Sequence, residues 1–354
     1  MTVSLLYLIT SFNNPLYSGK FRLGDRFRTY GQHSFIYDFA AESHRQGLRL
    51  HIAMDNASTF PLTAPLNRYA KILDLSAGDK IQWADYDATL ADVGADFKAT
   101  ALLGAPPVIT VAHNPYQEFA DGLLERSTRV MALNSYTRDE LSGRLPAHKL
   151  FVNWQGVDLE RFRPAPMPKQ TRPGPKVLVY SRIDAEKRDA VTATIDSLAA
   201  DPALDITVLG DGAGFWSISD KWGHRLTLIN YIPCHSIHRF VPGYDVVVSS
   251  GRGVMEAMAC AVPAIAVGRS FLGAVTPENV LELRGVNFSG YAGSNRPTDR
   301  IGETVRSCAG YGRDDLRRCA EKYFGVRGFV ERLLKEIENA GDSRSKPPLD
   351  LRDT

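Results

Sequence analysis

The stretch Val177–Lys187 (VLVYSRIDAEK) decides the fold of the second half of the chain. An apolar strand ends at a short polar turn, and two cations, Arg182 and Lys187, stand five positions apart after it. In open parallel sheets, ligands bind beyond the carboxyl ends of the strands, where a helix begins. Free N–H groups, a guanidinium and an ammonium at such a place suit a diphosphate. Solvated surface charge is the alternative interpretation of the two cations.

Apolar runs of strand length alternate with helical stretches on both sides of this segment. Such alternation is typical of parallel sheets that are built from βαβ units. We therefore expect an α/β protein with two Rossmann-like doubly wound domains facing a cleft. The expected strands are Ser4–Thr10, Leu48–Met54, Pro107–Ala112, Arg129–Leu133 and Lys149–Asn153 in the first half, and Lys176–Tyr180, Asp205–Leu209, Leu226–Ile229, Asp245–Val248 and Ala264–Val267 in the second.

A proline-rich break separates the two halves. Residues 164–175 hold five prolines in twelve positions, and proline fits neither a helix interior nor a central strand. We predict domains at 1–163 and 176–322, with residues 164–175 as the linker. A final helical pattern from about Asp314 to Ala340, interrupted near Gly325, leads to a polar tail at 341–354 that we expect to be disordered.

Composition excludes several classes of protein. The chain has 354 residues, of which 44% are hydrophobic and 23% are charged, as in soluble globular proteins. Lys plus Arg less Asp plus Glu is 42 − 40 = +2, which is too balanced for a dedicated nucleic-acid binder. No apolar run is long enough to span a bilayer, and the first strand lacks the flanks of a signal peptide. Four cysteines without C-x-x-C spacing indicate a reduced, cytoplasmic protein.

A second candidate site follows the strand that ends near Val248. Ser250, Gly251, Arg252 and Gly253 form a turn into a helix, and the two glycines let backbone N–H groups approach a ligand. Glu256 lies about one turn into that helix, where a carboxylate can accept hydrogen bonds from ribose hydroxyls. A purely structural turn is the alternative interpretation.

Two further fragments complete the candidates. The stretch Leu209–Gly214 (LGDGAG) does not match the G-x-G-x-x-G pattern of NAD sites. His113 ends the strand Pro107–Ala112, where a structural histidine is the alternative to a catalytic one. The histidines show no spacing that would bind a metal, so we expect no metal site.

In this order, the fragments resemble the retaining glycosyltransferases of family 4, which have the GT-B fold. The matching segments are Thr110–His113, Asn153–Pro164, Arg182 with Lys187, Gly210–Gly212, and Glu256–Ala266 with Ala261 in place of glycine. The resemblance implies a final helix, 323–340, that crosses back to the first domain. It also implies no cofactor, no metal, and a nucleoside-diphosphate sugar as donor.

The resemblance implies a role for each matched residue. Arg182 and Lys187 neutralise the diphosphate, Glu256 holds the ribose, and His113 positions the donor sugar. Gly210, Asp211, Tyr231, Ile232 and the turn from Ser250 to Gly253 complete the donor site, with the base read near Tyr231–Ile232. Gly31 and Gln32 are the best candidates for the family's N-terminal glycine-rich loop.

The chain departs from the family at two places. Most members have two glutamates eight positions apart, but Val248 stands where the first would be. The contact that this glutamate makes to the donor sugar is therefore either missing or supplied by Ser250, Gly251 or Arg252. A long basic insert, with Lys20, Arg22, Arg26 and Arg28, precedes Gly31. Solvated charge, an anionic acceptor and peripheral membrane contact remain open for this insert.

The resemblance predicts a retaining, metal-independent transfer of a sugar to an acceptor hydroxyl. The acceptor can be a glycan, a lipid-linked molecule or a small molecule, and it would enter from the first domain. Two alternatives remain: a nucleotide-sugar epimerase or other GT-B enzyme, and a non-catalytic protein that binds nucleotide sugars.

Overall fold

The computed structural model describes most of the chain, and its contacts form two compact units. Unit 1 comprises residues 1–21, 39–154 and 327–354, and unit 2 comprises residues 22–38 and 155–326. The described residues are 2–9, 31–55, 57–60, 62–94, 97–114, 117–166, 174–183, 187–290 and 300–342. Residues 20–28 of the basic insert, 167–173 of the predicted linker and 343–354 of the predicted tail lie outside them.

The change of unit comes before the prolines. Residue 163, the predicted end of the first domain, lies inside unit 2. Val157 and Phe162 explain this difference, because both side chains are fully buried in a core cluster of unit 2. At the other end, Phe324 is buried in the same cluster, so unit 2 continues to Val326 rather than to 322.

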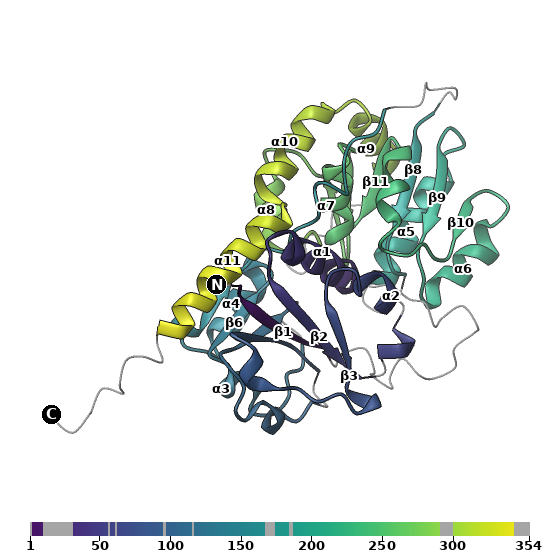
Figure 1. Cartoon of the computed structure of the whole chain (residues 1–354). Coiled ribbons are helices and arrows are strands. Elements are labelled where there is room, and N and C mark those ends of the chain that lie inside the picture. Colours follow the sequence, from purple (N-terminus) through teal and green to yellow (C-terminus); the bar gives the residue numbers. More distant parts are fainter. Residues whose placement is uncertain are drawn as a thin grey trace. The chain divides into compact units, whose positions relative to one another are not determined.

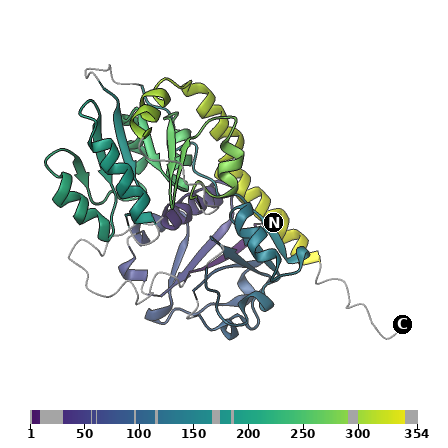
Figure 2. The ribbon, with the colours of Figure 1, turned by 180° about the vertical axis from the view of Figure 1, so that it is seen from behind.

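Unit 1 is built on a seven-stranded parallel sheet with the order β3-β2-β1-β4-β5-β6-β7. Its described helices include α1 (Gly31–Arg45), whose second half belongs to this unit, and α11 (Val326–Asp342), the yellow helix of Figures 1 and 2. β3 and β4 were not predicted. The strands are β1 (Ser4–Ile9), β2 (Arg49–Met54), β3 (Lys71–Asp74), β4 (Ala88–Asp92), β5 (Val108–Ala112), β6 (Arg129–Ala132) and β7 (Leu150–Val152); the other helices are α2 (Thr63–Leu66), α3 (Leu123–Arg126) and α4 (Ser135–Ser142).

Alternate residues of β1 face opposite sides of the unit 1 sheet, as the pleat of a strand requires. Leu6 and Leu8 join a core cluster with residues of the neighbouring strands. Tyr7 instead packs edge-on against Phe39 of α1, with 5.7 Å between the ring centroids. Phe39 packs in the same manner against Phe329 of α11, at 5.9 Å. Both faces of β1 are therefore buried, which explains its continuous apolar sequence.

Unit 2 is built on a six-stranded sheet with the order β10-β9-β8-β11-β12-β13. All its pairs are parallel except β12 with β13, and neighbouring strands β8, β9 and β10 are visible in Figure 1. The strands are β8 (Lys176–Tyr180), β9 (Asp205–Leu209), β10 (Thr227–Ile229), β11 (Val246–Ser249), β12 (Ala264–Val267) and β13 (Phe271–Ala274); the helices are α5 (Arg188–Ala199), α6 (Ala213–Trp222), α7 (Arg252–Ala259), α8 (Val280–Gly285), α9 (Ile301–Cys308) and α10 (Arg313–Tyr323).

Helices cover both faces of this sheet. Leu178 of β8 belongs to a cluster with residues of α7, α8 and α10, whereas Val177 and Val179 belong to a second cluster with residues of α5, α6 and α9. This arrangement and the two strand orders confirm the predicted fold class, two Rossmann-like α/β domains. The interruption predicted near Gly325 is also confirmed, because α10 ends at Tyr323 and α11 begins at Val326.

Ala261, which stands where the similar family has glycine, ends helix α7 in a left-handed conformation. Its φ is +58°, and its N–H donates to the Met258 carbonyl while the Val262 N–H donates to the Ala257 carbonyl. These two bonds form a Schellman cap, which usually has glycine at this position because a side chain is strained there.

Candidate functional site

The strand order of unit 2 reverses between β8 and β11. Open α/β sheets bind ligands at the carboxyl ends of the strands at such a switch point. Ser181 and Arg182 follow β8 there, and Ser250 follows β11. The sequence predicted candidates in both loops, and the pairing of β8 with β11 brings the two loops to the same edge.

Lys187 joins these two loops directly. Its Nζ donates a hydrogen bond to the Ser250 hydroxyl at 2.8 Å. Lys187 immediately precedes α5, so its ammonium lies near the amino end of a twelve-residue helix, where the dipole favours anions. Arg182 is partly buried in the loop between β8 and Lys187. A lysine held against a serine hydroxyl at a helix start is a suitable place for a phosphate oxygen.

The loop after β9 lies beside the loop after β8. The Ile183 N–H donates to the Asp211 carbonyl at 2.7 Å, and the Gly214 N–H donates to the Ile183 carbonyl at 2.9 Å. A Cβ on Gly210 would come within 2.0 Å of the Ser181 carbonyl oxygen, so only glycine allows this approach. The predicted donor residues Gly210 and Asp211 therefore lie next to the loop that carries Arg182.

The glycines of the second turn are needed for the turn itself. Gly251 has a φ of +54°, which disfavours a side chain. A Cβ on Gly253 would lie 2.0 Å from the Ser249 hydroxyl. The Gly253 N–H also donates to the Ser250 carbonyl at 3.2 Å, so this donor, expected to meet a ligand, already has a partner within the protein.

Arg252 and Glu256 belong to a buried ion network that also contains Asp38 and Arg161. Asp38 and Glu256 are completely buried, and Arg252 is 5% exposed. Both Arg161 and Arg252 bind the Asp38 carboxylate, one at each oxygen. Arg252 also bonds to Glu256 Oε1 at 3.2 Å and donates to the Gly156 carbonyl at 2.6 Å. Two guanidinium groups and two carboxylates thus balance one another within unit 2.

The network gives two predicted donor contacts an internal role. The guanidinium of Arg252 is occupied by Asp38, Glu256 and the Gly156 carbonyl. Glu256 Oε2 has no hydrogen-bond partner among the described residues. Burial raises the pKa of the Glu256 carboxyl, while the positive charge of Arg252 opposes that change. The predicted contact between Glu256 and a ribose stays a prediction, with Oε2 as the atom that could make it.

Val248 shows why the family's first glutamate has no counterpart here. The residue lies inside β11, is 1% exposed, and packs in the core shared with α5, α6 and α9. A side chain at this position faces the hydrophobic core rather than the edge of the sheet.

Four predicted site residues of unit 2 remain to be placed: Gly31, Gln32, Tyr231 and Ile232. Gly31 begins α1, and a Cβ on it would lie 3.8 Å from Arg252 Cδ, so it lies beside the ion network. Gln32 is partly buried. Ile232 packs against the core cluster that contains α7, and Tyr231 is partly buried, with its pKa raised by burial.

Unit 1 has its own polar cluster at the corresponding edge. His113 follows β5, and its Nε2 bonds to Asp92 Oδ2 at 2.8 Å. The Tyr7 hydroxyl, in the centre of β1, donates to the same oxygen at 2.9 Å. Gln117 Oε1 accepts from the His113 backbone N–H at 2.9 Å. The imidazole predicted to position a sugar is thus held by a buried carboxylate.

Sequence reasoning missed Asp92, Tyr7 and Asp38. Asp92 ends β4, whose short alanine-rich run (ATLAD) was not recognised as a strand. An aspartate at the end of an apolar run was the signal that could have found it. Asp38 carries no comparable signal, because it lies within a helix and its partner Arg252 is 214 positions away.

Metal ligands and cysteines add no further site. Within the described ranges, no group of three or more His, Cys, Asp or Glu side chains is placed to hold a metal ion. Cys234, Cys260, Cys308 and Cys319 are all buried and free.

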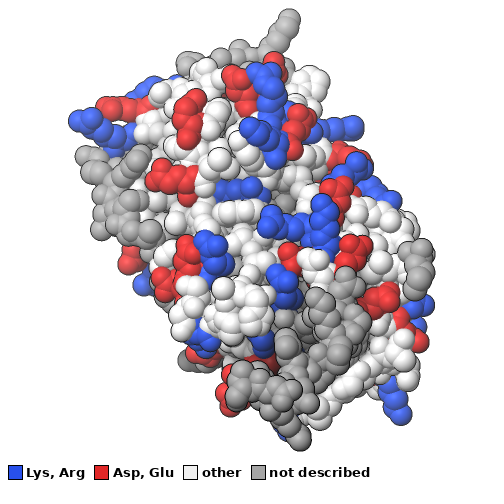
Figure 3. Space-filling model, turned by 90° about the vertical axis from the view of Figure 1, so that its left-hand side faces the viewer, with Lys and Arg blue, Asp and Glu red and all other residues white. Residues whose placement is uncertain are grey.

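On the face drawn in Figure 3, Lys and Arg side chains are intermixed with Asp and Glu, as the net charge suggests.

Comparisons with known proteins agree in fold. No family model matches the chain, and no curated protein matches it. Among solved structures, a glycosyltransferase from Rickettsia africae has a TM-score of 0.64 at 12% identity, covering 96% of this chain and 98% of its own. HepE from Anabaena, in complex with UDP and glucose, has a TM-score of 0.64 at 14% identity, covering 95% and 100%.

A third similar structure is a putative UDP-N-acetylglucosamine 2-epimerase from Listeria monocytogenes. Its TM-score is 0.54 at 12% identity, and the alignment covers 97% of each chain. Identities this low show the fold alone. The chain therefore has the two-domain GT-B fold of glycosyltransferases.

Proposed function

We propose that this chain is a retaining glycosyltransferase that uses a nucleoside-diphosphate sugar and no metal ion. The observation that carries the proposal is the bond between Lys187 and Ser250, which joins two predicted donor loops at the switch point of unit 2. The GT-B fold and the ordered set of family motifs support it. The donor base, the sugar and the acceptor are not part of the proposal.

In the proposed reaction, the bond between the sugar carbon and the diphosphate breaks, and the acceptor oxygen bonds to the same carbon. The acceptor hydroxyl loses its proton, and negative charge develops on the leaving diphosphate oxygen. Arg182 and Lys187 neutralise that charge. Cations placed where charge develops stabilise the transition state more than the ground state. Glu256 holds the ribose, and His113 positions the donor sugar.

The cellular location of the protein and its contact with a membrane are also proposals. Among the described residues, no helix combines the length and the apolar character needed to cross a bilayer. Four free thiols are compatible with action in a reducing cytoplasm, where thiols stay reduced. Peripheral membrane contact through residues 20–28 stays a proposal as well.

The experiment compares Lys187→Ala with a matched control. Purified chain is incubated with UDP-, GDP-, ADP- and dTDP-sugars, with and without an acceptor panel, in the presence of EDTA. We expect acceptor-dependent release of nucleotide and a product that keeps the anomeric configuration, read by NMR. Lys187→Ala should lower turnover roughly ten- to a thousandfold. Arg188→Ala changes the next residue, whose side chain is 56% exposed, and should leave turnover unchanged.

Each alternative predicts a different result. An epimerase releases nucleotide or an epimer without any acceptor; the similar structure from Listeria keeps this candidate open. A non-catalytic protein binds the sugar nucleotides, which raises its melting temperature, but gives no turnover with any acceptor. Near-normal turnover in Lys187→Ala would contradict the assignment of the phosphate site.

A further inference from the structure

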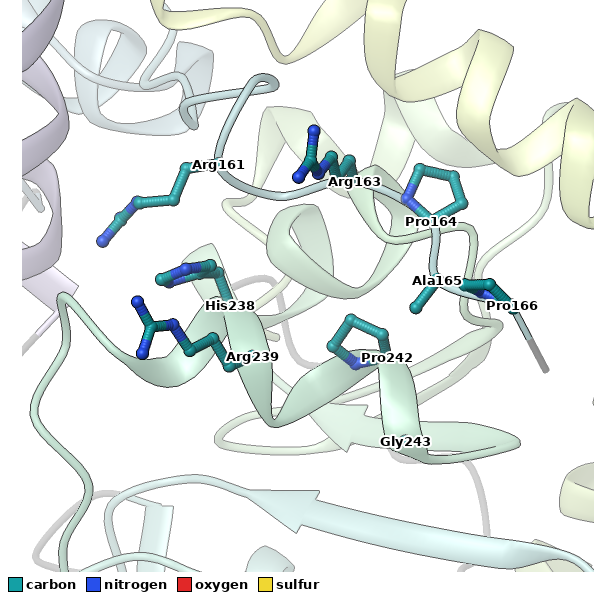
Figure 4. Close-up of a pocket in the computed structure, with 9 residues that line it drawn as sticks. All are labelled: Arg161, Arg163, Pro164, Ala165, Pro166, His238, Arg239, Pro242 and Gly243. Carbon is teal, nitrogen blue, oxygen red and sulfur yellow. The ribbon is translucent and has the colours of Figure 1, made fainter. Parts of the chain in front are cut away.

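Unit 2 contains a cavity of about 590 Å³ where residues 161–166 pass the loop between β10 and β11. Arg161, Arg163 and three neighbouring residues line one side, and His238, Arg239, Pro242 and Gly243 line the other (Figure 4). The volume is in the usual range for small-molecule sites. None of the predicted site residues lines it.

The lining is strongly cationic. It contains three arginines and no acidic residue. Arg163 and Arg239 are exposed, and within the described part of the chain neither forms an ion pair. Elsewhere in unit 2, exposed arginines such as Arg306 and Arg318 bind a carboxylate. Among the described residues, these two guanidinium groups at one cavity thus have no anionic partner.

Arg161 differs from these two because it is rigidly held. Its guanidinium carbon lies 4.8 Å from the ring centre of Tyr37 and 4.7 Å from that of Phe162. One terminal nitrogen binds Asp38, and the other donates to the Cys234 carbonyl at 3.2 Å. Its Nε is buried and has no hydrogen-bond partner among the described residues. A fixed cation therefore borders a cavity with two adaptable cations.

The other walls are apolar or neutral. Pro164, Ala165, Pro166 and Pro242 supply apolar surface. The pKa of His238 is lowered by burial and by the charges of Arg161 and Arg239, so the imidazole is mainly neutral at pH 7. A ligand that matches this cavity has an anionic group for the arginines and a further part that contacts the prolines.

We propose that this cavity binds a small molecule that carries a phosphate group. Guanidinium groups bind phosphate oxygens in pairs of parallel hydrogen bonds, and several arginines favour a doubly charged group over a carboxylate. The size of the cavity leaves room for the sugar or other ring to which the phosphate is attached. The inference does not depend on the proposed function, because it involves neither Lys187 nor Ser250.

The test measures binding by calorimetry at fixed ionic strength. The probes are inorganic phosphate and a sugar phosphate such as glucose 1-phosphate, with chloride as the reference anion. Binding is measured in Lys187→Ala, which weakens the candidate donor site. Adding Arg163→Gln and Arg239→Gln should weaken binding of the sugar phosphate at least about tenfold, because each substitution removes charge-assisted hydrogen bonds to the phosphate. Tighter binding of the sugar phosphate than of phosphate identifies an attached ring as part of the ligand.

Arg318→Gln is the matched control, since this arginine is 68% exposed and belongs to the same unit. It should leave binding unchanged. Equal affinity with and without Arg163 and Arg239, or complete loss of binding in Lys187→Ala alone, would overturn the proposal. Absence of turnover in the unsubstituted chain, or near-normal turnover in Lys187→Ala, with retained binding of the sugar phosphate would contradict only the proposed function.

Discussion

The two sheets have the same strand order at their centre but different chemistry at their carboxyl edges. In unit 1, β4 ends at Asp92, whose buried carboxylate bonds to His113 after β5 and to the Tyr7 hydroxyl of β1. In unit 2, β8 and β11 end near Lys187 and Ser250, with a network of two arginines and two carboxylates behind them.

The difference shows that topology supplies the place and side chains supply the chemistry. A carboxylate that holds an imidazole suits the positioning of a neutral, hydroxyl-rich group. An ammonium at a helix start suits an anion.

Of the substitutions that test this contrast, Asp38→Asn should cause the largest change, a loss of folding stability in unit 2. The substitution leaves Arg161 and Arg252 without their shared carboxylate, and loss of one partner from a buried ion pair typically costs about 3–5 kcal/mol. Urea unfolding measures this loss. The control Asp315→Asn, whose side chain is 60% exposed, should change stability by less than about 0.5 kcal/mol. A loss below about 1 kcal/mol in Asp38→Asn would show that the network does not stabilise unit 2.

Thiol labelling should separate the two units, because all four cysteines belong to unit 2. Burial raises the pKa of Cys234 and Cys260 to about 12, so both stay protonated and unreactive at pH 8 in the folded protein. Asp38→Asn should accelerate labelling by a factor of about 100 or more if unit 2 opens as a whole. Asp92→Asn should leave the labelling rate unchanged, and equal acceleration by both would mean that the units open together.

Asp92→Asn should reduce activity without opening unit 2. The amide keeps the size of the side chain but removes the charge that holds His113 Nε2. A hydrogen bond to a charged group is worth roughly 1.5–3 kcal/mol, so we expect turnover to fall about tenfold or more, with the Kd for nucleotide unchanged. Tyr7→Phe removes only the second bond to Asp92 and should have a smaller effect. A weaker nucleotide affinity in either variant would contradict the division between the two edges.

The smallest expected effect is on the pH dependence of folding stability. His238 has a lowered pKa in the folded protein, so the unfolded chain binds a proton at higher pH than the folded one does. Its contribution to stability is therefore lost as pH falls through its ordinary range near 6.5. Glu256 acts in the opposite direction, because its raised pKa lets the folded protein bind a proton first.

His238→Gln isolates the histidine. The variant should lose less stability than the original chain between pH 7 and pH 5.5, measured by urea unfolding at both values. His224→Gln changes an exposed histidine of the same unit and serves as the control. The same pH slope in all three proteins would remove His238 as a source of acid sensitivity.

Sequence reasoning predicted ten of the thirteen described strands, and the exceptions share a cause. β3 (KILD), β4 (ATLAD) and β13 (FLGA) have four or five residues, and none has a long apolar run. Pairing with a neighbouring strand makes them strands, and the sequence does not show that pairing. Buried strands rich in Leu, Val and Ile, such as β1 (SLLYLI) and β8 (KVLVY), carry their own signal.

The residues of the candidate site also divide into those that the sequence predicts and those that it does not. Lys187 and Ser250 were predictable because each follows a recognisable strand end. Asp38 and Arg161 were not, because a buried ion network depends on contacts between residues 120 or more positions apart. Ala261 was marked by the family's glycine, and its φ of +58° gives the physical reason for that preference.

The chain leaves unit 2 inside helix α1, after Asp38, and returns to it only at Gln155, which limits how the molecule can be dissected. A gene fragment for residues 155–326 encodes Arg161, Arg252 and Glu256 but not Asp38, so it would leave one uncompensated positive charge in its interior. A chimera that exchanges the C-terminal half with a related protein meets the same difficulty. Recombinants should fold only when residues 31–38 are inherited from the same parent as residues 155–326.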